Sequence, residues 1–193
     1  MERRSNADEW SQTILPEQAF GTRMQRSLLK FSLPNVAVGP DPFTLSELPD
    51  DVEFVLLFFQ RDHYCTNCRS QVQELADRIE AFHDRNAEVV SIVPEPVDRV
   101  AEWQSSYELP YPLLADPDAT VGDAYDQPVR FGILGKVSDF FGRMPAVVII
   151  DRRGGEPAIV STHKGRSTFD RPEIDALLAE LDELRADRTV HEE

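Results

Sequence analysis

The sequence predicts an α/β fold in which a central mixed sheet carries helices on both faces. One observation is the strand-like segment of residues 52–59, whose residues 54–59 are all apolar, because a strand without polar interruptions belongs in the buried centre of a largely parallel sheet. The stretch that follows it places apolar residues at helical spacing. Strand-like and helix-like segments then alternate along the rest of the chain, which is the pattern of a layered α/β domain.

The first half of the chain is predicted to form a strand–helix–strand–helix unit. Residues 43–48 are typical of a short strand and turn, and they precede the buried strand. Residues 88–93 are expected to form a second parallel strand, and Asp98 is the expected N-cap of a helix that ends at Tyr107. The helix between the two strands has one apolar face, which consists of Cys68, Val72, Leu75, Ile79 and Phe82.

The second half adds an edge strand, a short helix and a hairpin. Residues 111–116 have the character of an edge strand, and a helix is expected over residues 120–125. A linker over residues 127–143 leads to the β-type run of residues 146–150. A glycine-containing turn joins that run to a strand at residues 157–162, which predicts a hairpin.

A C-terminal helix completes the domain. Asp170 and Glu173 stand at the spacing of a capping box in front of it. The order of elements matches the thioredoxin fold, a central sheet with helices on both faces. We expect an N-terminal extension at residues 1–27, the thioredoxin-like domain at residues 28–185 and an acidic tail at residues 186–193. The buried face of the last helix is predicted to contain Ile174, Leu177, Leu178, Leu181 and Leu184.

Charge and hydropathy restrict the classes of partner. The formal net charge of -15 repels nucleic acid and anionic lipid, so neither is an expected partner. No apolar run approaches the roughly 20 residues of a membrane-spanning helix, and the N-terminus has no secretory signal pattern, so we expect a cytoplasmic protein. Lysine occurs only at positions 30, 136 and 164, and arginine supplies the other basic residues. This acidic, arginine-rich composition favours a high-salt cytoplasm, and the alternative is an acidic protein from a GC-rich genome.

The two cysteines form the strongest candidate site. Cys65-Thr66-Asn67-Cys68 lies where the buried strand passes into the helix, and a C-x-x-C beside a βαβ pattern indicates redox chemistry. A thiol at a helix N-terminus meets unpaired N–H groups and the positive end of the helix dipole, which lower its pKa from about 8.5 into the range of about 3.5 to 7.5. Cys65 is therefore the expected nucleophile. Cys68 is in phase with the buried face, which makes it the expected resolving thiol.

Two alternative roles for the cysteines are less favoured. A structural disulfide is disfavoured because the cytoplasm is reducing and a three-residue spacing closes too small a loop to constrain the unfolded chain. Zinc could use His63, Cys65 and Cys68, but a structural zinc site needs a fourth ligand that the scattered histidines do not offer. We therefore expect no metal and no cofactor. His63 itself is expected to be a solvated loop residue, with stabilisation of a Cys65 thiolate as the alternative.

A second feature supports the redox prediction. Met144-Pro145 stands directly before the strand of residues 146–150, where a proline suits a strand start because it cannot donate to the ladder. The X–Pro bond is also the one in which a cis peptide costs little, and in a thioredoxin fold this turn faces the dithiol. We expect Met144 and Pro145, together with Tyr64 and Thr66, to shape the substrate site. The alternative is a plain proline at a strand start.

The chain also resembles a known family over residues 28–185. The residues that carry the likeness are Val55–Phe59, the run from Cys65 to Arg69, Leu113–Pro117, and Val148–Asp151. They are similar to the peroxiredoxin-like branch of the thioredoxin superfamily, the alkyl hydroperoxide reductase/thiol-specific antioxidant (redoxin) group. The resemblance implies a peroxidatic or redox-active Cys65 and a cis-proline of thioredoxin type at Pro145.

The chain departs from the peroxiredoxin pattern at three positions. Peroxiredoxins carry a proline and a hydroxyl residue before the cysteine and an arginine at the start of the late strand, and these positions here hold Phe58, Asp62 and Pro145. The usual peroxide-activating groups are therefore missing, which favours a disulfide substrate over a peroxide. The candidates to replace the arginine are Arg61, Arg69 and Arg143, each with an ordinary surface arginine as the alternative.

The predicted function is that of a thiol-dependent oxidoreductase, either a thiol–disulfide oxidoreductase or an antioxidant thiol peroxidase. Cys65 would attack a disulfide or a peroxide, and Cys68 would resolve the intermediate as an intramolecular disulfide. The partners would be that substrate and an external thiol reductant, either thioredoxin-like or a small thiol. A different class of function is a redox-switched binding or sensor module, whose partner surface would include residues 131–135 with Phe140 and Phe141.

The charge predicts how salt affects stability. A net charge of -15 repels itself in the compact state, and salt screens that repulsion. We expect the thermal midpoint of unfolding to rise from dilute buffer to molar potassium chloride. Differential scanning fluorimetry across a salt series measures this midpoint, and a flat or falling trend would contradict the high-salt origin.

Overall fold

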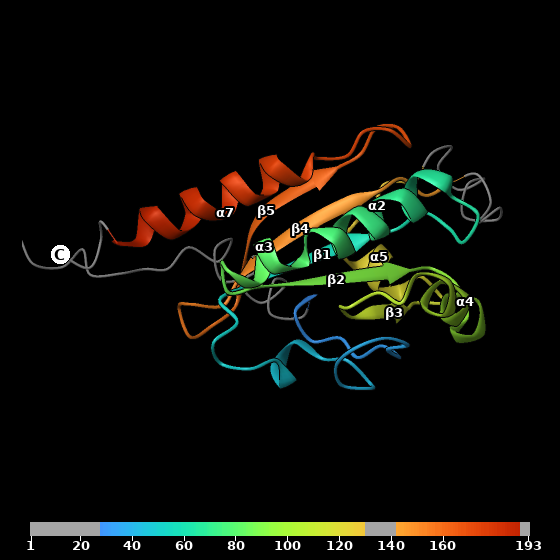
Figure 1. The fold of residues 1–193 in the computed structure, drawn as a ribbon, viewed down its shortest axis with the longest axis horizontal. Coiled ribbons are helices and arrows are strands. Elements are labelled where there is room, and N and C mark those ends of the chain that lie inside the picture. Colours follow the sequence, from blue (N-terminus) through green and yellow to red (C-terminus); the bar gives the residue numbers. More distant parts are fainter. Residues whose placement is uncertain (1–27, 130–141, 190–193) are drawn as a thin grey trace, which may run out of the picture.

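The computed structural model describes residues 28–129 and 142–189 of the chain, and their core is a five-stranded mixed sheet (Figure 1). The strands are β1 (Phe54–Phe59), β2 (Ala87–Val93), β3 (Leu113–Ala115), β4 (Ala146–Asp151) and β5 (Ala158–Lys164). Their order across the sheet is β3-β2-β1-β4-β5. β1, β2 and β3 run parallel, whereas β4 pairs antiparallel with β1 and β5. All six residues of β1 are buried, as the uninterrupted apolar run predicts.

Helices and loops cover both faces of the sheet. They are η1 (Leu45–Glu47), α2 (Thr66–Asp77), α3 (Ile79–His83), α4 (Val97–Tyr107), α5 (Thr120–Ala124) and α7 (Ile174–Thr189). One core cluster joins the even-numbered side chains of β1 to the apolar residues of α2, α3, α4 and α7. The other joins the odd-numbered side chains of β1 to α5, η1 and the segment before η1. The alternation of β1 side chains between two cores confirms the predicted α/β class.

Three details of the helices differ from the sequence prediction. Arg78 leaves the helical conformation at φ -111°, so the single expected helix is divided into α2 and α3. Asp98 is not the N-cap of α4, because Pro96 occupies that position and Asp98 lies in the first turn. The Asp170 carboxylate accepts the backbone N–H of Arg166 at 2.9 Å and therefore organises a loop rather than capping α7.

The segment before β1 also differs from its prediction. Phe43 forms a single antiparallel bridge with Leu33, with N···O distances of 2.8 and 3.2 Å, and the chain then enters η1. A strand over residues 43–48 is therefore reduced to one bridge and a turn of 3₁₀-helix. The apolar side chains of this segment still serve the core, since Phe43 and Leu45 are buried against the odd-numbered face of β1.

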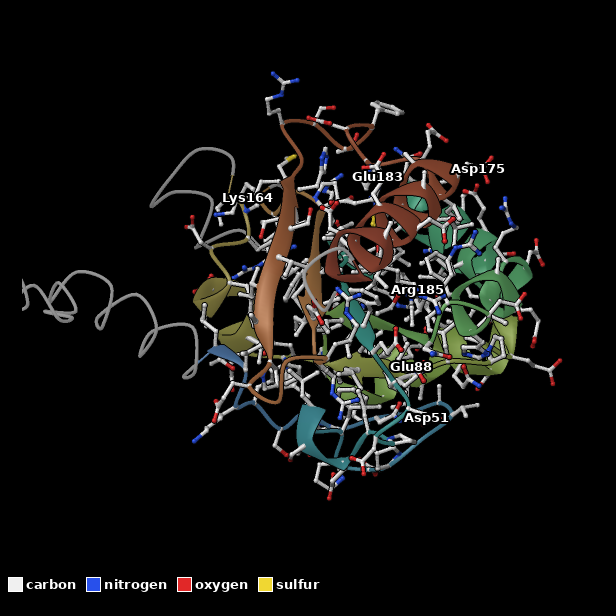
Figure 2. All side chains as sticks on the ribbon, turned by 90° about the vertical axis from the view of Figure 1, so that its left-hand side faces the viewer. Asp51, Glu88, Lys164, Asp175, Glu183 and Arg185 are labelled. Atoms are coloured by element: carbon white, nitrogen blue, oxygen red, sulfur yellow. A yellow bond between two sulfur atoms is a disulfide. The ribbon has the colours of Figure 1, made fainter. Side chains whose placement is uncertain are left out.

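Among the described residues, the buried charged side chains are Asp62, Asp116 and Arg143, and the others are at least partly exposed. Acidic side chains such as Asp51, Asp175 and Glu183 are exposed (Figure 2). Glu88 of β2 is more enclosed, and burial raises the pKa of its carboxyl group above the usual value, with His83 acting in the opposite direction. Within residues 28–129 and 142–189, no helix has both the length and the hydrophobicity needed to cross a bilayer.

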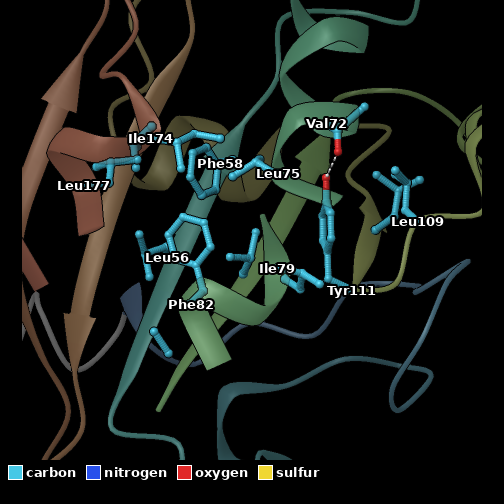
Figure 3. Close-up of a cluster of buried hydrophobic side chains, with 14 of the residues drawn as sticks. Leu56, Phe58, Val72, Leu75, Ile79, Phe82, Leu109, Tyr111, Ile174 and Leu177 are labelled. Atoms are coloured by element: carbon cyan, nitrogen blue, oxygen red, sulfur yellow. Dashed lines mark hydrogen bonds between the residues drawn. The ribbon is translucent and has the colours of Figure 1, made fainter. Parts of the chain in front are cut away.

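One buried hydrogen bond ties α2 to the edge of the sheet. The Tyr111 side chain is fully buried, and its hydroxyl donates to the Val72 carbonyl oxygen at 3.0 Å (Figure 3). The same hydroxyl lies 3.5 Å from the Ser91 hydroxyl. Tyr125 gives the opposite case, because its buried hydroxyl has no hydrogen-bond partner among the described residues. Replacing each tyrosine in turn therefore measures how much the hydrogen bond between Tyr111 and Val72 contributes to the free energy of unfolding.

We expect Tyr111→Phe to lower the free energy of unfolding by about 1 to 2 kcal/mol, because it removes a buried hydroxyl that is paired. Tyr125→Phe is the matched control and should be neutral or stabilising, since it removes a hydroxyl that is buried without a partner among the described residues. Urea unfolding of both variants measures these changes. Equal losses in the two variants would contradict the role given to the Tyr111 bond.

Candidate redox site

The cysteine pair lies at the junction of β1 and α2. Cys65 is the N-cap residue of α2, and its Sγ accepts the backbone N–H of Cys68 at 3.2 Å. A sulfur in this position takes the place of the side-chain oxygen of an ordinary N-cap and satisfies one of the free donors of the first turn. The same donor and the helix dipole stabilise negative charge on Cys65 when the sulfur is a thiolate.

Cys65 and Cys68 are joined as a disulfide, with Cα atoms 5.2 Å apart. Both cysteines are buried, but to different extents. Cys68 is completely buried in the core cluster under α2, whereas Cys65 keeps 7% exposure. Cys65 also lines a surface cavity of about 410 Å³, and Cys68 does not line it. Of the two cysteines, Cys65 is therefore the one that an incoming molecule would meet first.

The mouth of this cavity is partly aromatic. Tyr64 is 54% exposed and Phe169 is 81% exposed, and both line the cavity. Thr66 lines it from the first position of α2, so Tyr64 and Thr66 both lie in the wall of the cavity that Cys65 lines, and their role in shaping a substrate site stays a prediction. The described residues that line it are Arg61, Asp62, Tyr64, Cys65, Thr66, Asn67, Thr168 and Phe169.

Met144 and Pro145 are placed differently from the prediction. Neither lines the cavity, and the peptide bond between them is trans, since the cis bond in the described ranges precedes Pro42. Met144 is buried and its carbonyl accepts a bond from the Gln127 side chain. Pro145 is covered by Gly165, whose N–H donates to the Pro145 carbonyl at 2.9 Å, and a Cβ added at Gly165 would come within 2.8 Å of the Pro145 ring. The expected cis-proline is therefore wrong, and Pro145 is a proline at a strand start.

Asp62, which stands where peroxiredoxins have a hydroxyl residue, organises the turn into α2. Its side chain is largely buried, and one carboxylate oxygen accepts the backbone N–H of Tyr64 at 2.9 Å. Its carbonyl oxygen accepts the N–H of Cys65 at 3.4 Å. Both bonds hold the chain in the conformation that delivers Cys65 to the start of the helix. A carboxylate only accepts hydrogen bonds when ionised, so it cannot donate to a peroxide as a hydroxyl does.

His63 turns toward α4. Its Nε2 lies 3.3 Å from a carboxylate oxygen of Glu102, and its ring packs against Trp103 at a centroid distance of 5.9 Å. The side chain is only 12% exposed, so the expectation of a solvated loop residue is wrong. Across the residues that the structure describes, no group of three or more His, Cys, Asp and Glu side chains could hold a metal ion.

The three arginines considered from the sequence have other partners. Arg61 donates to the Arg143 carbonyl at 2.8 Å, although it also lines the cavity. Arg69 donates through two nitrogens to the His63 carbonyl at 3.1 and 3.0 Å. Arg143 is buried and pairs with Asp123 at 3.0 Å.

The guanidinium group beside the sulfurs belongs to Arg171, which sequence reasoning missed. Its Nη2 lies 3.1 Å from Cys68 Sγ and 3.7 Å from Cys65 Sγ. The group is held by bonds from Nε to the Thr168 carbonyl and from Nη1 to the Gln71 side-chain oxygen. Burial lowers the pKa of Arg171 to about 10, and the nearby Arg61 contributes to the same shift, so the group stays protonated at neutral pH.

The fold and site agree with comparisons to known proteins. The model of the AhpC/TSA family matches residues 24–155. Peroxiredoxin Bcp of Bacillus subtilis (strain 168) is 21% identical over 102 residues, which cover 53% of this chain and 64% of that relative.

Among solved structures, peroxidoxin BcpB from Mycobacterium tuberculosis is 27% identical with a TM-score of 0.63, over 79% of this chain and 91% of that chain. The reduced 2-Cys peroxiredoxin of Plasmodium vivax is 19% identical with a TM-score of 0.67, over 82% and 94% of the two chains. These likenesses agree with the thioredoxin-like architecture of the described residues. Because the family model spans more than half of the sequence, the chain belongs to the AhpC/TSA family.

Proposed function

We propose that the protein is a thiol peroxidase in which Cys65 is the attacking thiolate and Cys68 is the resolving thiol. The observation that carries the proposal is the unequal setting of two bonded sulfurs at one helix N-terminus. Cys65 lines the cavity, and its Sγ accepts a hydrogen bond from the backbone N–H of Cys68. Cys68 is fully buried in the hydrophobic core. A reactive thiol needs access and a lowered pKa, and a resolving thiol needs proximity.

The reaction balances with these two residues and an external thiol. The Cys65 thiolate attacks the terminal oxygen of a hydroperoxide, the O–O bond breaks, and the departing oxygen takes a proton to leave as an alcohol or water. Cys65 is then a sulfenic acid. The Cys68 thiolate attacks Cys65 Sγ, hydroxide leaves and is protonated to water, and the disulfide forms. Two electrons from an external dithiol, or from two small thiols, return both cysteines to the reduced state.

A second candidate function is the reduction of protein disulfides. Asp62 favours it, because this carboxylate offers no hydroxyl donor to a peroxide and is already engaged with the N–H of Tyr64. The same two cysteines would serve, since the Cys65 thiolate attacks a disulfide sulfur and Cys68 then displaces the partner. The exposed aromatic side chains of Tyr64 and Phe169 at the cavity mouth would suit contact with a polypeptide.

We expect a thioredoxin-like protein or a small thiol to reduce the disulfide, and we expect the reaction to take place in the cytoplasm, where such thiols are kept reduced. The alternative of a redox-switched sensor remains a separate hypothesis. Its predicted surface, residues 131–135 with Phe140 and Phe141, lies outside the described residues.

We expect hydrogen peroxide to oxidise the reduced protein with a second-order rate constant below about 10⁵ M⁻¹s⁻¹. This limit lies near the lower end of the range of kcat/KM values that enzymes reach. The reason is that Asp62 stands in place of the hydroxyl that would polarise the O–O bond. Stopped-flow fluorescence measures the rate, with a protein disulfide as the parallel substrate. A larger constant would contradict the importance of the missing hydroxyl, and oxidation by the disulfide alone would replace the peroxidase proposal with the reductase.

The two cysteines should behave differently when each is replaced. Cys68→Ser should leave Cys65 reactive and trap a sulfenic acid or a mixed disulfide, because the displacing thiol is gone. Cys65→Ser should not react, since its remaining thiol is fully buried. Mass spectrometry after exposure to peroxide or to a model disulfide distinguishes the two, and equal adduct formation in both variants would refute the assigned roles.

A further inference from the structure

We propose that Arg171 is a catalytic residue for the reductive half of the cycle, in which its guanidinium group stabilises Cys68 as the departing thiolate while an external thiol attacks Cys65. This inference rests on the proposed dithiol function. It assigns a role to a residue of the loop between β5 and α7, far along the chain from the cysteine motif.

Each sulfur has its own principal donor. The backbone N–H of Cys68 points at Cys65 Sγ at 3.2 Å, and Arg171 Nη2 lies 3.1 Å from Cys68 Sγ. The same nitrogen is farther from Cys65 Sγ, at 3.7 Å. The N-terminus of α2 therefore donates a hydrogen bond to Cys65 Sγ, and the guanidinium group donates one to Cys68 Sγ. A charged donor is the stronger of the two kinds, because hydrogen bonds to ionised groups exceed neutral ones.

Accessibility decides which sulfur is attacked and which one leaves. A reductant entering the cavity reaches Cys65, since Cys68 is fully buried and does not line the cavity. The external thiolate forms a bond to Cys65 Sγ, the Cys65–Cys68 bond breaks, and its electron pair moves to Cys68 Sγ. The products are a mixed disulfide on Cys65 and a thiolate on Cys68, and a second external thiol then releases reduced Cys65. The rate of such a step rises as the pKa of the leaving thiol falls.

A buried thiolate without a counter-charge would be a poor leaving group. Burial in an apolar environment disfavours the charged form of a thiol, and Cys68 lies in the hydrophobic core cluster under α2. The protonated guanidinium group of Arg171 supplies the missing positive charge at hydrogen-bond distance. It also supplies the donor for the reverse step, in which the Cys68 thiolate attacks an oxidised Cys65.

Among the described residues, no carboxylate is paired with this guanidinium group while the disulfide is intact. Its hydrogen bonds go to two neutral oxygens, the Thr168 carbonyl and the Gln71 amide. Glu74 and Glu173 line the adjoining hollow with Arg171, but neither forms an ion pair with it in the described structure. Arg61 is a further positive neighbour. A partly buried cation that is held only by neutral groups gains stability when a thiolate forms beside it. Arg171 should therefore favour the reduced state over the disulfide.

The experiment is the redox equilibrium of the purified full-length protein with a glutathione series, followed by trapping and mass spectrometry of the reduced and oxidised forms. We expect Arg171→Gln to lower the equilibrium constant for reduction about tenfold, which for a two-electron couple is about 30 mV toward a more negative potential. The rate at which a small thiol reduces the disulfide should fall as well. Arg171→Lys should retain part of both effects, because it keeps the charge and loses the planar fork.

Two further variants separate this role from a general effect of charge and from a loss of folding. Arg166→Gln is the matched control: it removes one positive charge from the same loop at a side chain that is 93% exposed, and it should leave the equilibrium unchanged. Gln71→Glu keeps Arg171 but gives its guanidinium group a carboxylate partner, and it should shift the equilibrium toward the disulfide, which tests the idea even if Arg171→Gln folds poorly.

The outcomes of this experiment and of the peroxide assay are distinguishable. A wild-type equilibrium in Arg171→Gln and Gln71→Glu would overturn the inference, and a lower thermal midpoint without a change in potential would make Arg171 a structural tie of its loop. An equal shift in Arg166→Gln would reduce the effect to general charge and would also overturn it. Failure of the proposed function would appear separately, as a Cys65 thiol that neither peroxide nor a protein disulfide oxidises.

Discussion

The site depends on the way in which the central strand passes into a helix. β1 is buried on both faces, so its position and direction are fixed by two core clusters at once. The turn after it is held by Asp62, which accepts the N–H groups of Tyr64 and Cys65. Cys65 therefore arrives at the start of α2 as its N-cap, and the helical period then places Cys68 beneath it in the core. The unequal exposure of the two sulfurs follows from these local constraints.

Much of this arrangement could be predicted because it depends on short-range patterns in the sequence. A continuous apolar run marks a strand that is buried on both faces, and a 3.6-residue period marks the buried side of a helix. Both patterns bracket the cysteine motif, so the placement of Cys65 and Cys68 followed from neighbouring residues. The ends of helices were harder to predict, since Pro96 occupies the N-cap position expected of Asp98. Asp170 accepts a hydrogen bond from the backbone of Arg166 in its own loop. A polar side chain near a helix start has several local partners, and the sequence does not rank them.

The residues that sequence reasoning missed depend on contacts between distant segments. Arg171 is separated from Cys68 by 103 residues, and it reaches the sulfurs only because the chain returns over α2 between β5 and α7. Its residue type gave no signal, because arginine is common throughout this sequence. The error at Pro145 has a related cause. The return of the chain from β5 puts Gly165 directly over Pro145, and nothing near Pro145 in the sequence indicates this cover.

The departures from the peroxiredoxin pattern are related to one another by where they place charged groups in the site. The position that holds a hydroxyl in peroxiredoxins is Asp62, whose carboxylate and carbonyl oxygens accept backbone N–H groups of the turn. The cation beside the dithiol is Arg171, which lies closer to the buried sulfur than to the one that faces the cavity. Positive charge at the buried sulfur acts on disulfide formation and opening, whereas positive charge in the cavity, which Arg61 lines, would act on the peroxide. On the proposed function, Arg171 therefore assists thiol–disulfide exchange, the step that both candidate substrates share.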